Sequence, residues 1–305
     1  MNLTFENAYL EYIEYAKLKL KPQSILKIKS RFNTHILPYF CDKKIKDISA
    51  LDYLDWQKKI ENLNYRFKYK KALHYCNVAL WNYLKIFHGV NNNVPSLVGN
   101  FKNNYEITSY SYFTLEEFKL FINHIDTPIY KTLFNFLFFT GCRLGETLAL
   151  TFNDLKHNCI YINKTLTKES YNGSRILTLP KTKKSIRTLR IDNMLIEELA
   201  ELQIYYIKKF GFFNNDFYIF GGLEPLSPST IERKKNYYCD KAGLKRIRLH
   251  DFRHSHATLL FNNEVPINLI TYRLGHSNIN TTLTTYCHLI PENEKRTLEV
   301  LNSLR

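Results

Sequence analysis

Four separate stretches of the chain carry side chains that suit chemistry on a phosphate group. Arg143 and Arg253 supply guanidinium groups, which bind phosphate oxygens through two parallel hydrogen bonds. His250 lies three residues before Arg253, so that on a helix an imidazole and a cation share neighbouring parts of one face. Such a pair suits a phosphate whose charge changes during a reaction. The remaining candidates are Lys181 in "LPKTKKSIRTLRI", and His276 and Tyr286 in "RLGHSNINTTLTTYCHL".

Each candidate also has an ordinary structural explanation when it is taken alone. Glu146 follows Arg143 by three residues in "TGCRLGETLAL", so the two side chains could simply pair in a buried segment. In the functional interpretation, Glu146 instead orients Arg143 towards a phosphate. Lys181 would be an exposed turn residue, and Tyr286 one of 22 tyrosines with its ring packed and its hydroxyl in water.

A metal site is a second interpretation of the histidines. His250, His254 and His256 are close in sequence, but no carboxylate or cysteine is suitably placed to complete a ligand set. The six cysteines are scattered without a CxxC pair, so neither a zinc knuckle nor a disulfide framework is indicated. We therefore expect no metal and no other cofactor.

The elements that must position these residues are mostly helices. Apolar residues recur at helical spacing over 3–20, 23–40, 46–63 and 69–87, with Pro38 expected to end the second helix and Ser49 to cap the third. The polar, aperiodic stretch 91–112 indicates a linker. We predict a helical domain over residues 1–95, a linker over 96–112 and a second domain over 113–305.

The second domain is predicted to be mainly helical with one small antiparallel sheet. Thr114 and Glu117 form a capping box that opens a helix, and "YKTLFNFLFFTG" is a buried helix that ends at Gly141. The segments "CIYIN", "RILTLP" and "SIRTLRI" read as strands, with "KTKK" (181–184) as the turn between the last two. Further helices are expected around 194–209, 228–241, 251–262, 266–273, 278–286 and 291–303.

The charge of the chain predicts a polyanionic partner. The 305 residues carry a net charge of +15, and residues 1–110 alone hold 17 basic and 9 acidic side chains, so the excess is spread over both domains. The segment "KKIENLNYRFKYKK" interleaves bases with aromatic rings, as a DNA-backbone contact would. No apolar run is long enough to span a membrane, and no signal peptide is evident. We predict a cytoplasmic, nucleoid-associated protein whose DNA contacts include Lys58, Lys59, Arg66, Lys68, Lys70, Lys71, Lys183, Lys184 and Arg187.

Taken together, the four stretches resemble the active-site motifs of the tyrosine recombinase (phage integrase) family. The words "TGCRLGE", "PKTKKSIRTL", "LHDFRHSHATLLF" and "RLGHSNINTTLTTYCHL" occur in the family's order over some 150 residues, and "LKPQSILKIKSRFNTHILPYFCDKKIKDIS" is similar to its helical core-binding domain. Within the family, these motifs are most similar to those of integrases of phages and mobile elements of low-GC bacteria. The resemblance implies two domains: a SAM-like DNA-binding domain and a catalytic domain.

The resemblance also implies roles for the candidate residues. Tyr286 would attack the scissile phosphate and form a 3′-phosphotyrosyl link, while Arg143 and Arg253 clamp the non-bridging oxygens. Lys181 would be the general acid for the 5′-hydroxyl. The other implied roles are base or proton-transfer assistance for His250, a hydrogen bond to the phosphate for His276 and orientation of Arg143 for Glu146.

The family resemblance implies partners and leaves alternatives open. It implies double-stranded recombination sites, a homotetramer in the synapse, and an excisionase or a host DNA-bending protein as further partners. The chain begins directly with core-binding helices, without the arm-binding domain of many phage integrases, so Xer-like chromosome dimer resolution and DNA inversion remain alternatives to integration. A catalytically inactive DNA-binding protein and a type IB topoisomerase are the other interpretations; the six filled catalytic positions argue against the first, and the two-domain layout and integrase-like wording against the second.

Overall fold

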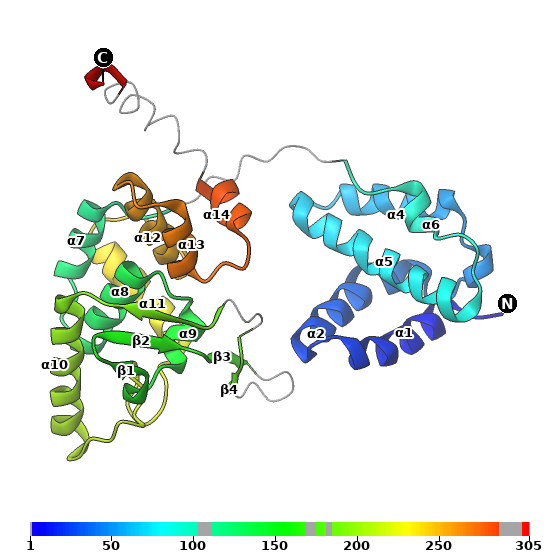
Figure 1. The fold of residues 1–305 in the computed structure, drawn as a ribbon. Helices are drawn as coiled ribbons and strands as arrows, with labels where there is room; N and C mark the ends of the chain where they lie inside the picture. Colours follow the sequence, from blue (N-terminus) through cyan, green and yellow to red (C-terminus); the bar gives the residue numbers. More distant parts are fainter. Residues whose placement is uncertain (1, 103–110, 169–174, 181–184, 287–300, 305) are drawn as a thin grey trace. The chain divides into compact units, whose positions relative to one another are not determined.

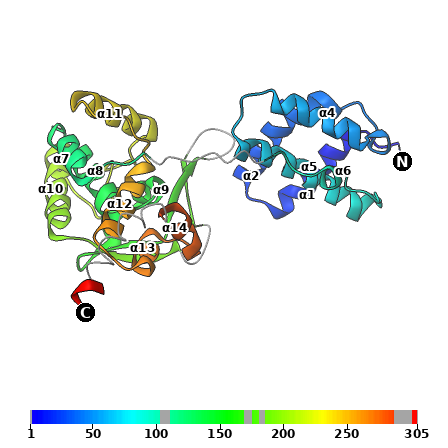
Figure 2. The ribbon, with the colours of Figure 1, turned by 90° about the horizontal axis from the view of Figure 1, so that it is seen from above.

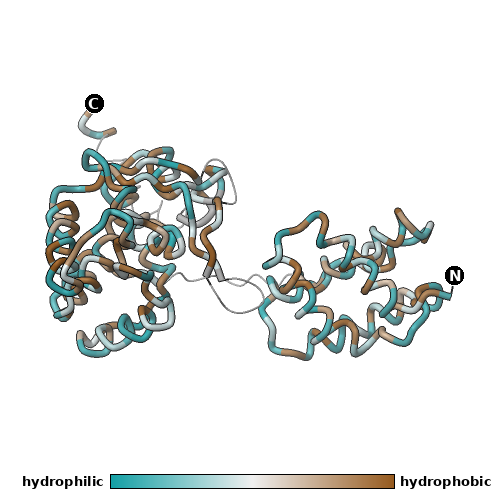
Figure 3. The backbone as a smooth tube through the Cα atoms, turned by 90° about the horizontal axis from the view of Figure 1, so that it is seen from below, coloured by the Kyte–Doolittle hydropathy of each residue, from teal (hydrophilic) through white to brown (hydrophobic). Residues whose placement is uncertain are grey.

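A computed structural model describes residues 2–102, 111–168, 175–180, 185–286 and 301–304 of the chain. Contacts divide the chain into an N-terminal unit that runs to Thr108 and a C-terminal unit that begins at Ser109 (Figure 1). In both units hydrophobic and hydrophilic segments alternate along the helices, as expected for helices that bury one face (Figure 3). No helix in the described ranges is long and apolar enough to cross a membrane.

The N-terminal unit is built from helices alone in its described part. They are α1 (Phe5–Lys19), α2 (Pro22–Arg31), the π-helical turn η1 (Phe32–Ile36), α3 (Leu37–Phe40), the short helix η2 (Ile45–Asp47), α4 (Ala50–Glu61), α5 (Phe67–His88) and α6 (Val94–Val98). Ser49 caps α4 in a reciprocal box with Asp52, as its sequence predicts. The core is rich in aromatic rings, among them Phe32, Phe40 and Trp56.

Two features of this unit differ from the sequence-based expectation. The second helical segment ends at Phe40, near Pro38 as predicted, but it is not a regular α-helix: a π-helical turn widens the backbone just before Pro38 and lets the helix continue past it. The carbonyl of His35 in that turn accepts a hydrogen bond from Trp56 Nε1 (2.8 Å). Within the segment predicted as a linker, α6 and Phe101 pack against the N-terminal core.

The C-terminal unit places helices around two small antiparallel sheets. Its elements are α7 (Leu115–Asn123), α8 (Pro128–Thr140), α9 (Leu144–Ala149), η3 (Phe152–Asp154), β1 (Leu155–Lys156), β2 (Cys159–Ile162), β3 (Thr165–Lys168), β4 (Arg175–Thr178), β5 (Arg187–Arg190), α10 (Asn193–Phe210), α11 (Pro228–Lys241), α12 (Asp251–Asn262), α13 (Ile267–Leu274) and α14 (Ile279–Tyr286). The predicted class, mainly helical with a small antiparallel sheet component, is confirmed. The predicted capping box of Thr114 and Glu117 is also present.

The strand pairing corrects the predicted hairpin. One sheet has the order β1-β2-β5 and the other pairs β3 with β4, so the strands before and after "KTKK" belong to different sheets. Pairing of this kind depends on contacts between distant segments, which alternation within each strand does not reveal. The predicted helix over 291–303 lies, up to residue 300, outside the described residues.

The core of the C-terminal unit surrounds α8. This helix contacts both α10 and α12, and ten of its residues are buried. Phe138 of α8 stacks on Phe118 with ring centroids 3.7 Å apart, and Phe134 stacks on Phe252 of α12 at 5.4 Å. Helices α12, α13 and α14 lie side by side in both ribbon views (Figures 1 and 2). Because α8 is packed tightly in the core, its C-terminal end, beside which the candidate residues lie, is held in a fixed position.

Candidate active site

The C-terminus of α8 is the anchor of the candidate site. The helix ends at Gly141, whose φ of +65° is the left-handed conformation that glycine adopts without strain. Side chains from α12 and α13 satisfy the carbonyls that a helix end leaves free, and cations are favoured there by the helix dipole. The bonds run from His256 Nδ1 to Phe138 O (2.9 Å), from Arg253 Nη1 to Gly141 O (2.9 Å) and from Arg273 Nη2 to Phe139 O (3.3 Å).

Arg253 is a buried cation with an open hydrogen-bonding position. Arg253 is only 3% exposed, and no carboxylate in the described part of the chain forms an ion pair with it. Nη2 has no hydrogen-bond partner among the described residues. Burial, with the nearby charge of Arg143, lowers the pKa of Arg253 to about 9, so the group stays charged at neutral pH. A buried, incompletely bonded cation is costly unless an anion completes the site.

Arg143 and Glu146 form the pair that their spacing predicts. Arg143 is the residue before α9, and its Nη1 donates to Glu146 Oε1 (2.7 Å) while its backbone N–H donates to Oε2 (3.1 Å). Arg143 Nη2 also donates to the carbonyl of Gly275 (3.3 Å). The Arg143 side chain is 37% exposed and that of Glu146 4%, so a buried carboxylate holds a guanidinium that reaches solvent.

Arg187 corrects the predicted set of DNA contacts. It was expected on the surface, but it is 3% exposed and donates from Nη2 to Glu146 Oε2 (3.0 Å). Its remaining donors bond the carbonyls of Arg273 (Nε, 2.7 Å) and Ser185 (Nη1, 3.1 Å). Burial alone would raise the pKa of Glu146, but the charges of Arg187 and Arg143 outweigh it and hold that pKa below its ordinary value.

His276 lies at the corner between α13 and α14. Gly275 ends α13 with a φ of +63°, and a Cβ there would lie 2.8 Å from Arg187 Nη1, so both the turn and the close approach require glycine. His276 Nδ1 is 2.8 Å from the hydroxyl of Thr282 on α14. Tyr286 is the last residue of α14; its side chain is not among those the structure describes.

The histidines of the site are held neutral. Burial, followed by the charges of Arg253 and Arg143, lowers the pKa of His276 to about 3. His250 is exposed, yet the protein packed around it and the charge of Arg253 lower its pKa as well. His254, whose ring lies 5.3 Å from that of His250, has its pKa lowered to about 4 by burial and by His250. The common and largest cause is burial, and around His250 and His276 the charges of Arg253 and Arg143 add to it; an anionic ligand would balance those charges.

The alternative metal interpretation of the histidines does not fit these positions. His256 is 2% exposed, is hydrogen-bonded to the end of α8 and accepts from Arg273 Nε (3.5 Å), so neither ring nitrogen is available to a metal. In the described ranges, no three His, Cys, Asp or Glu side chains gather in a ligand group.

Lys181 lies outside the described residues, as do Lys183 and Lys184. The elements on either side of that segment are both attached to the site. Strand β4, which ends at Thr178, pairs with β3, and β3 packs so closely on α9 that a Cβ at Gly145 would lie 2.7 Å from Thr165 Oγ1. Strand β5 begins at Arg187, which binds Glu146.

The other predicted DNA-contact residues belong to the N-terminal unit and stay predictions. Lys58 pairs with Asp55 (2.9 Å), and Lys70 pairs with Glu61. Lys59 lies over the ring of Tyr39 (4.5 Å) and Lys71 over that of Tyr75 (5.8 Å). Tyr65 and Tyr69 pack edge-on against His35, which orders the segment that carries Arg66 and Lys68.

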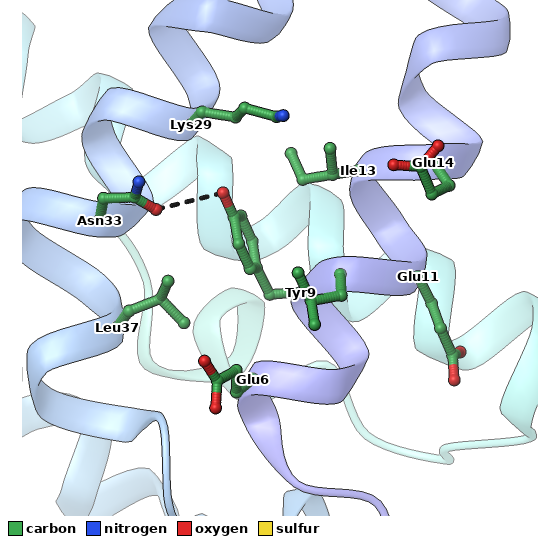
Figure 4. A pocket seen from close by; sticks show the side chains of 9 residues that line it. Glu6, Tyr9, Glu11, Ile13, Glu14, Lys29, Asn33 and Leu37 are labelled. Carbon is green, nitrogen blue, oxygen red and sulfur yellow. Dashed lines mark hydrogen bonds between the residues drawn. The ribbon is translucent and has the colours of Figure 1, made fainter.

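A pocket in the N-terminal unit has the opposite electrostatic character (Figure 4). It has a volume of about 570 Å³ and lies between α1 and the α2–η1 segment; its lining includes three glutamates, Glu6, Glu11 and Glu14, and one lysine, Lys29. Inside it, Tyr9 donates to Asn33 Oδ1 (3.2 Å). Lys29 is the one cation in this lining, so the pocket is a poor candidate for a contact with the DNA backbone.

Sequence reasoning missed the residues that support the site from behind. Arg187, Arg273, His256 and Thr282 contact the candidate residues or the backbone that carries them, and each is buried or half-buried. The signal present in the sequence was their proximity to the motifs: Arg273 and Thr282 flank His276, and His256 follows Arg253 by three residues.

Comparison with known proteins gives the same two-part division. Residues 111–293 match the model of the "Phage integrase family", and residues 4–60 match that of the "Phage integrase, N-terminal SAM-like domain". Among curated proteins, the ICEBs1 integrase of Bacillus subtilis (strain 168) is 37% identical over 196 residues, which cover 62% of this chain and 53% of that protein. The chain spans about half the length of the first curated relatives it matches.

Solved structures share the fold at low identity. The Tn1549 transposon integrase in complex with a circular intermediate DNA superimposes with a TM-score of 0.77 at 18% identity, covering 98% of this chain and 99% of that chain. A lambda integrase tetramer bound to a Holliday junction gives a TM-score of 0.67 at 16% identity, covering 90% and 78%.

Proposed function

This chain belongs to the phage integrase family, and we propose that it is a site-specific tyrosine recombinase that integrates and excises a mobile DNA element. The observation that carries the proposal is the buried Arg253, a cation that has no ion-pair partner and one unbonded donor among the described residues, beside Arg143. Together, Arg253 and the neighbouring Arg143 suit the two non-bridging oxygens of a phosphodiester. The likeness to the ICEBs1 integrase favours a mobile element as the source of the DNA.

In the proposed reaction, the hydroxyl oxygen of Tyr286 forms a bond to the scissile phosphorus, and the bond from phosphorus to the 5′-oxygen breaks. The proton of Tyr286 passes to His250, whose neutral imidazole has the capacity to accept it. Lys181 gives a proton to the leaving 5′-oxygen. The 3′-phosphotyrosyl bond retains the energy of the phosphodiester, so a 5′-hydroxyl from another strand reverses the attack and completes the exchange.

The supporting residues keep the clamp in place during this reaction. Glu146 fixes Arg143 through its side chain and its backbone, and Arg187 neutralises the second oxygen of the same carboxylate. Without Arg187, Glu146 would attract Arg143 more strongly and compete with the phosphate for it. The anchoring of β4 through β3 to α9, and of β5 through Arg187 to Glu146, supports the placement of Lys181 near the clamp.

The partners and the division of the chain are part of the same proposal. The core-binding domain extends from the N-terminus through Phe101, which packs in the N-terminal core; residues 113–305 form the catalytic domain, and the two domains together bind double-stranded recombination sites. A homotetramer forms in the synapse, a proposal supported by the likeness to the lambda integrase tetramer on a Holliday junction. An excisionase or a host DNA-bending protein assists, and the protein resides with the nucleoid.

A nicked suicide substrate tests the proposal, because loss of a short fragment traps the covalent complex. The wild-type protein should form a denaturant-resistant adduct with the DNA, and Tyr286→Phe should bind the same DNA without forming it. Tyr272→Phe is a matched control, since that exposed tyrosine on α13 only donates to the carbonyl of Thr188 (3.1 Å) and should form the adduct normally. Equal adduct from Tyr286→Phe and wild type would refute the assignment of the nucleophile.

A further inference from the structure

A chain of three side chains joins the two helices at the corner that carries His276. The hydroxyl of Thr271 on α13 donates to the hydroxyl of Thr282 on α14 (3.0 Å), and the same hydroxyl of Thr282 lies 2.8 Å from His276 Nδ1. Thr282 is fully buried, with 0% of its surface exposed. Water therefore cannot replace a missing hydrogen bond to the Thr282 side chain.

The direction of these hydrogen bonds determines which ring nitrogen of His276 carries the proton. Thr282 accepts the proton of Thr271, so its own proton is left to be donated, and His276 Nδ1 is the acceptor within reach. If Nδ1 carried a proton instead, the buried Thr282 hydroxyl would receive two donors, and its own proton would have no acceptor among the described residues. A buried donor without an acceptor costs about 1–3 kcal/mol.

We propose that Thr282 is a positioning residue of the recombination site: by donating to Nδ1, it holds His276 in the single neutral tautomer that has its proton on Nε2, on the opposite side of the ring. Nε2 has no hydrogen-bond partner among the described residues. The ring lies beside the phosphate clamp, since the carbonyl of the preceding Gly275 accepts from Arg143. His276 thus presents a fixed N–H donor to a phosphate oxygen, a role that rests on the proposed function.

The neutral state of the ring makes this arrangement necessary. With its pKa lowered to about 3, His276 carries only one ring proton at the pH of the cell. A protonated imidazolium would donate from both nitrogens whatever its neighbours did, whereas a neutral ring donates from Nε2 only if Nδ1 is an acceptor.

Thr282 also connects the donor to the helix that carries the proposed nucleophile. It precedes Tyr286 by four residues, which places the two positions on the same side of α14. The bond from Thr271 ties that helix to α13, and the bond to His276 ties it to the corner. One buried hydroxyl therefore sets both the tautomer of the donor and the position of the helix beside it.

Three variants separate the hydroxyl from the shape of the side chain. Thr282→Val keeps the branched shape and removes the hydroxyl, Thr282→Ser keeps the hydroxyl, and Thr188→Val makes the same change at an exposed position of β5. The rate of adduct formation on the nicked substrate should fall about five- to tenfold in Thr282→Val, the equivalent of one hydrogen bond. It should stay within about twofold in the other two, and Thr282→Val should cost little more once His276→Gln is present.

Nitrogen-15 NMR of protein with labelled histidine reads the tautomer without any reaction, and His276→Gln identifies the signal. The wild type and Thr282→Ser should show one tautomer, protonated on Nε2, while Thr282→Val should show both. A wild-type proton on Nδ1, or a Thr282→Val rate equal to that of Thr188→Val, would overturn the proposal. If Thr282→Val folds poorly, Thr282→Ala provides the second test, because it also removes the hydroxyl and should also show both tautomers; a single Nε2 tautomer in that variant would overturn the proposal. A wild type that forms no adduct would remove the proposed function, while the NMR result would still decide the tautomer.

Discussion

Replacing Glu146 with Gln should destabilise the C-terminal unit far more than the loss of an ordinary ion pair. Glu146 is the one carboxylate that forms ion pairs with Arg143 and Arg187 in the described part of the chain. The Arg187 side chain is 1% exposed and that of Glu146 is 4%, so this pair is buried, whereas Arg143 is 37% exposed. Glutamine preserves the size of the side chain but leaves Arg187 as a buried cation without an anion.

The magnitude follows from the burial of each pair. Removing one partner of a buried ion pair costs about 3–5 kcal/mol, and loss of the half-exposed pair with Arg143 adds at most about 1 kcal/mol. For a unit of this size, each kcal/mol lowers the melting temperature by about 2–4 °C. The total loss of about 3–6 kcal/mol should therefore lower the melting temperature of the unit by about 6–24 °C in Glu146→Gln.

Hydrogen exchange followed by mass spectrometry measures the corresponding loss of stability in the C-terminal unit alone. Peptides from α8 and α9 report on the C-terminal unit, while fluorescence of the two tryptophans, Trp56 and Trp81, reports on the N-terminal unit and should not change. Asp240→Asn is the control, because Asp240 is 51% exposed and its partner Arg246 is 60% exposed, and solvent screens an ion pair of this kind. If Glu146→Gln lowers the stability of the C-terminal unit no more than Asp240→Asn does, the reasoning about the buried ion pair of Glu146 and Arg187 is refuted.

Three further predictions test other parts of the account. Burial, then the charge of Arg273, lowers the pKa of His256 to about 3, so between pH 6.5 and 3 the unfolded chain binds a proton that the folded chain does not, and the free energy of unfolding falls as the pH falls. From pH 7.5 to 5, the free energy of unfolding in urea should fall by about 2 kcal/mol more in the wild type than in His256→Gln. An equal fall in both proteins would contradict this prediction. Adduct formation should be unchanged in excess EDTA, and its abolition would restore the metal interpretation. Lys181→Ala should cleave slowly but recover on a substrate with a 5′-bridging sulfur, a leaving group that needs no acid; no recovery would remove Lys181 as the acid.

The local signals in the sequence predicted the helices well. The capping boxes at Ser49 and Thr114 and the glycine after α8 act within three or four residues, so the sequence contains all the partners involved. The strands near "KTKK" were found, but their pairing was not, because β5 pairs with β2 across more than 20 residues. The π-helical turn before Pro38 was not predicted, since it has no sequence signal of its own.

The sequence predicted the residues proposed to contact the phosphate but not the residues that support them. Arg143, Arg253 and His276 follow from motifs whose order the family shares. Arg187 looked like one more surface base in a basic stretch, because its burial depends on Glu146, 41 residues away, and on the turn at Gly275. Whether an arginine faces a ligand or a carboxylate is a property of the assembled fold.

The most direct test of the central claim is to find the atom that holds the DNA. The adduct from the suicide substrate is digested with nuclease and trypsin, and the nucleotide-bearing peptide is sequenced by mass spectrometry. The account predicts a 3′-linked nucleotide on Tyr286, in a peptide from "LGHSNINTTLTTYCHLIPENEK". A nucleotide on any other residue, or a 5′-phosphate link, would contradict it.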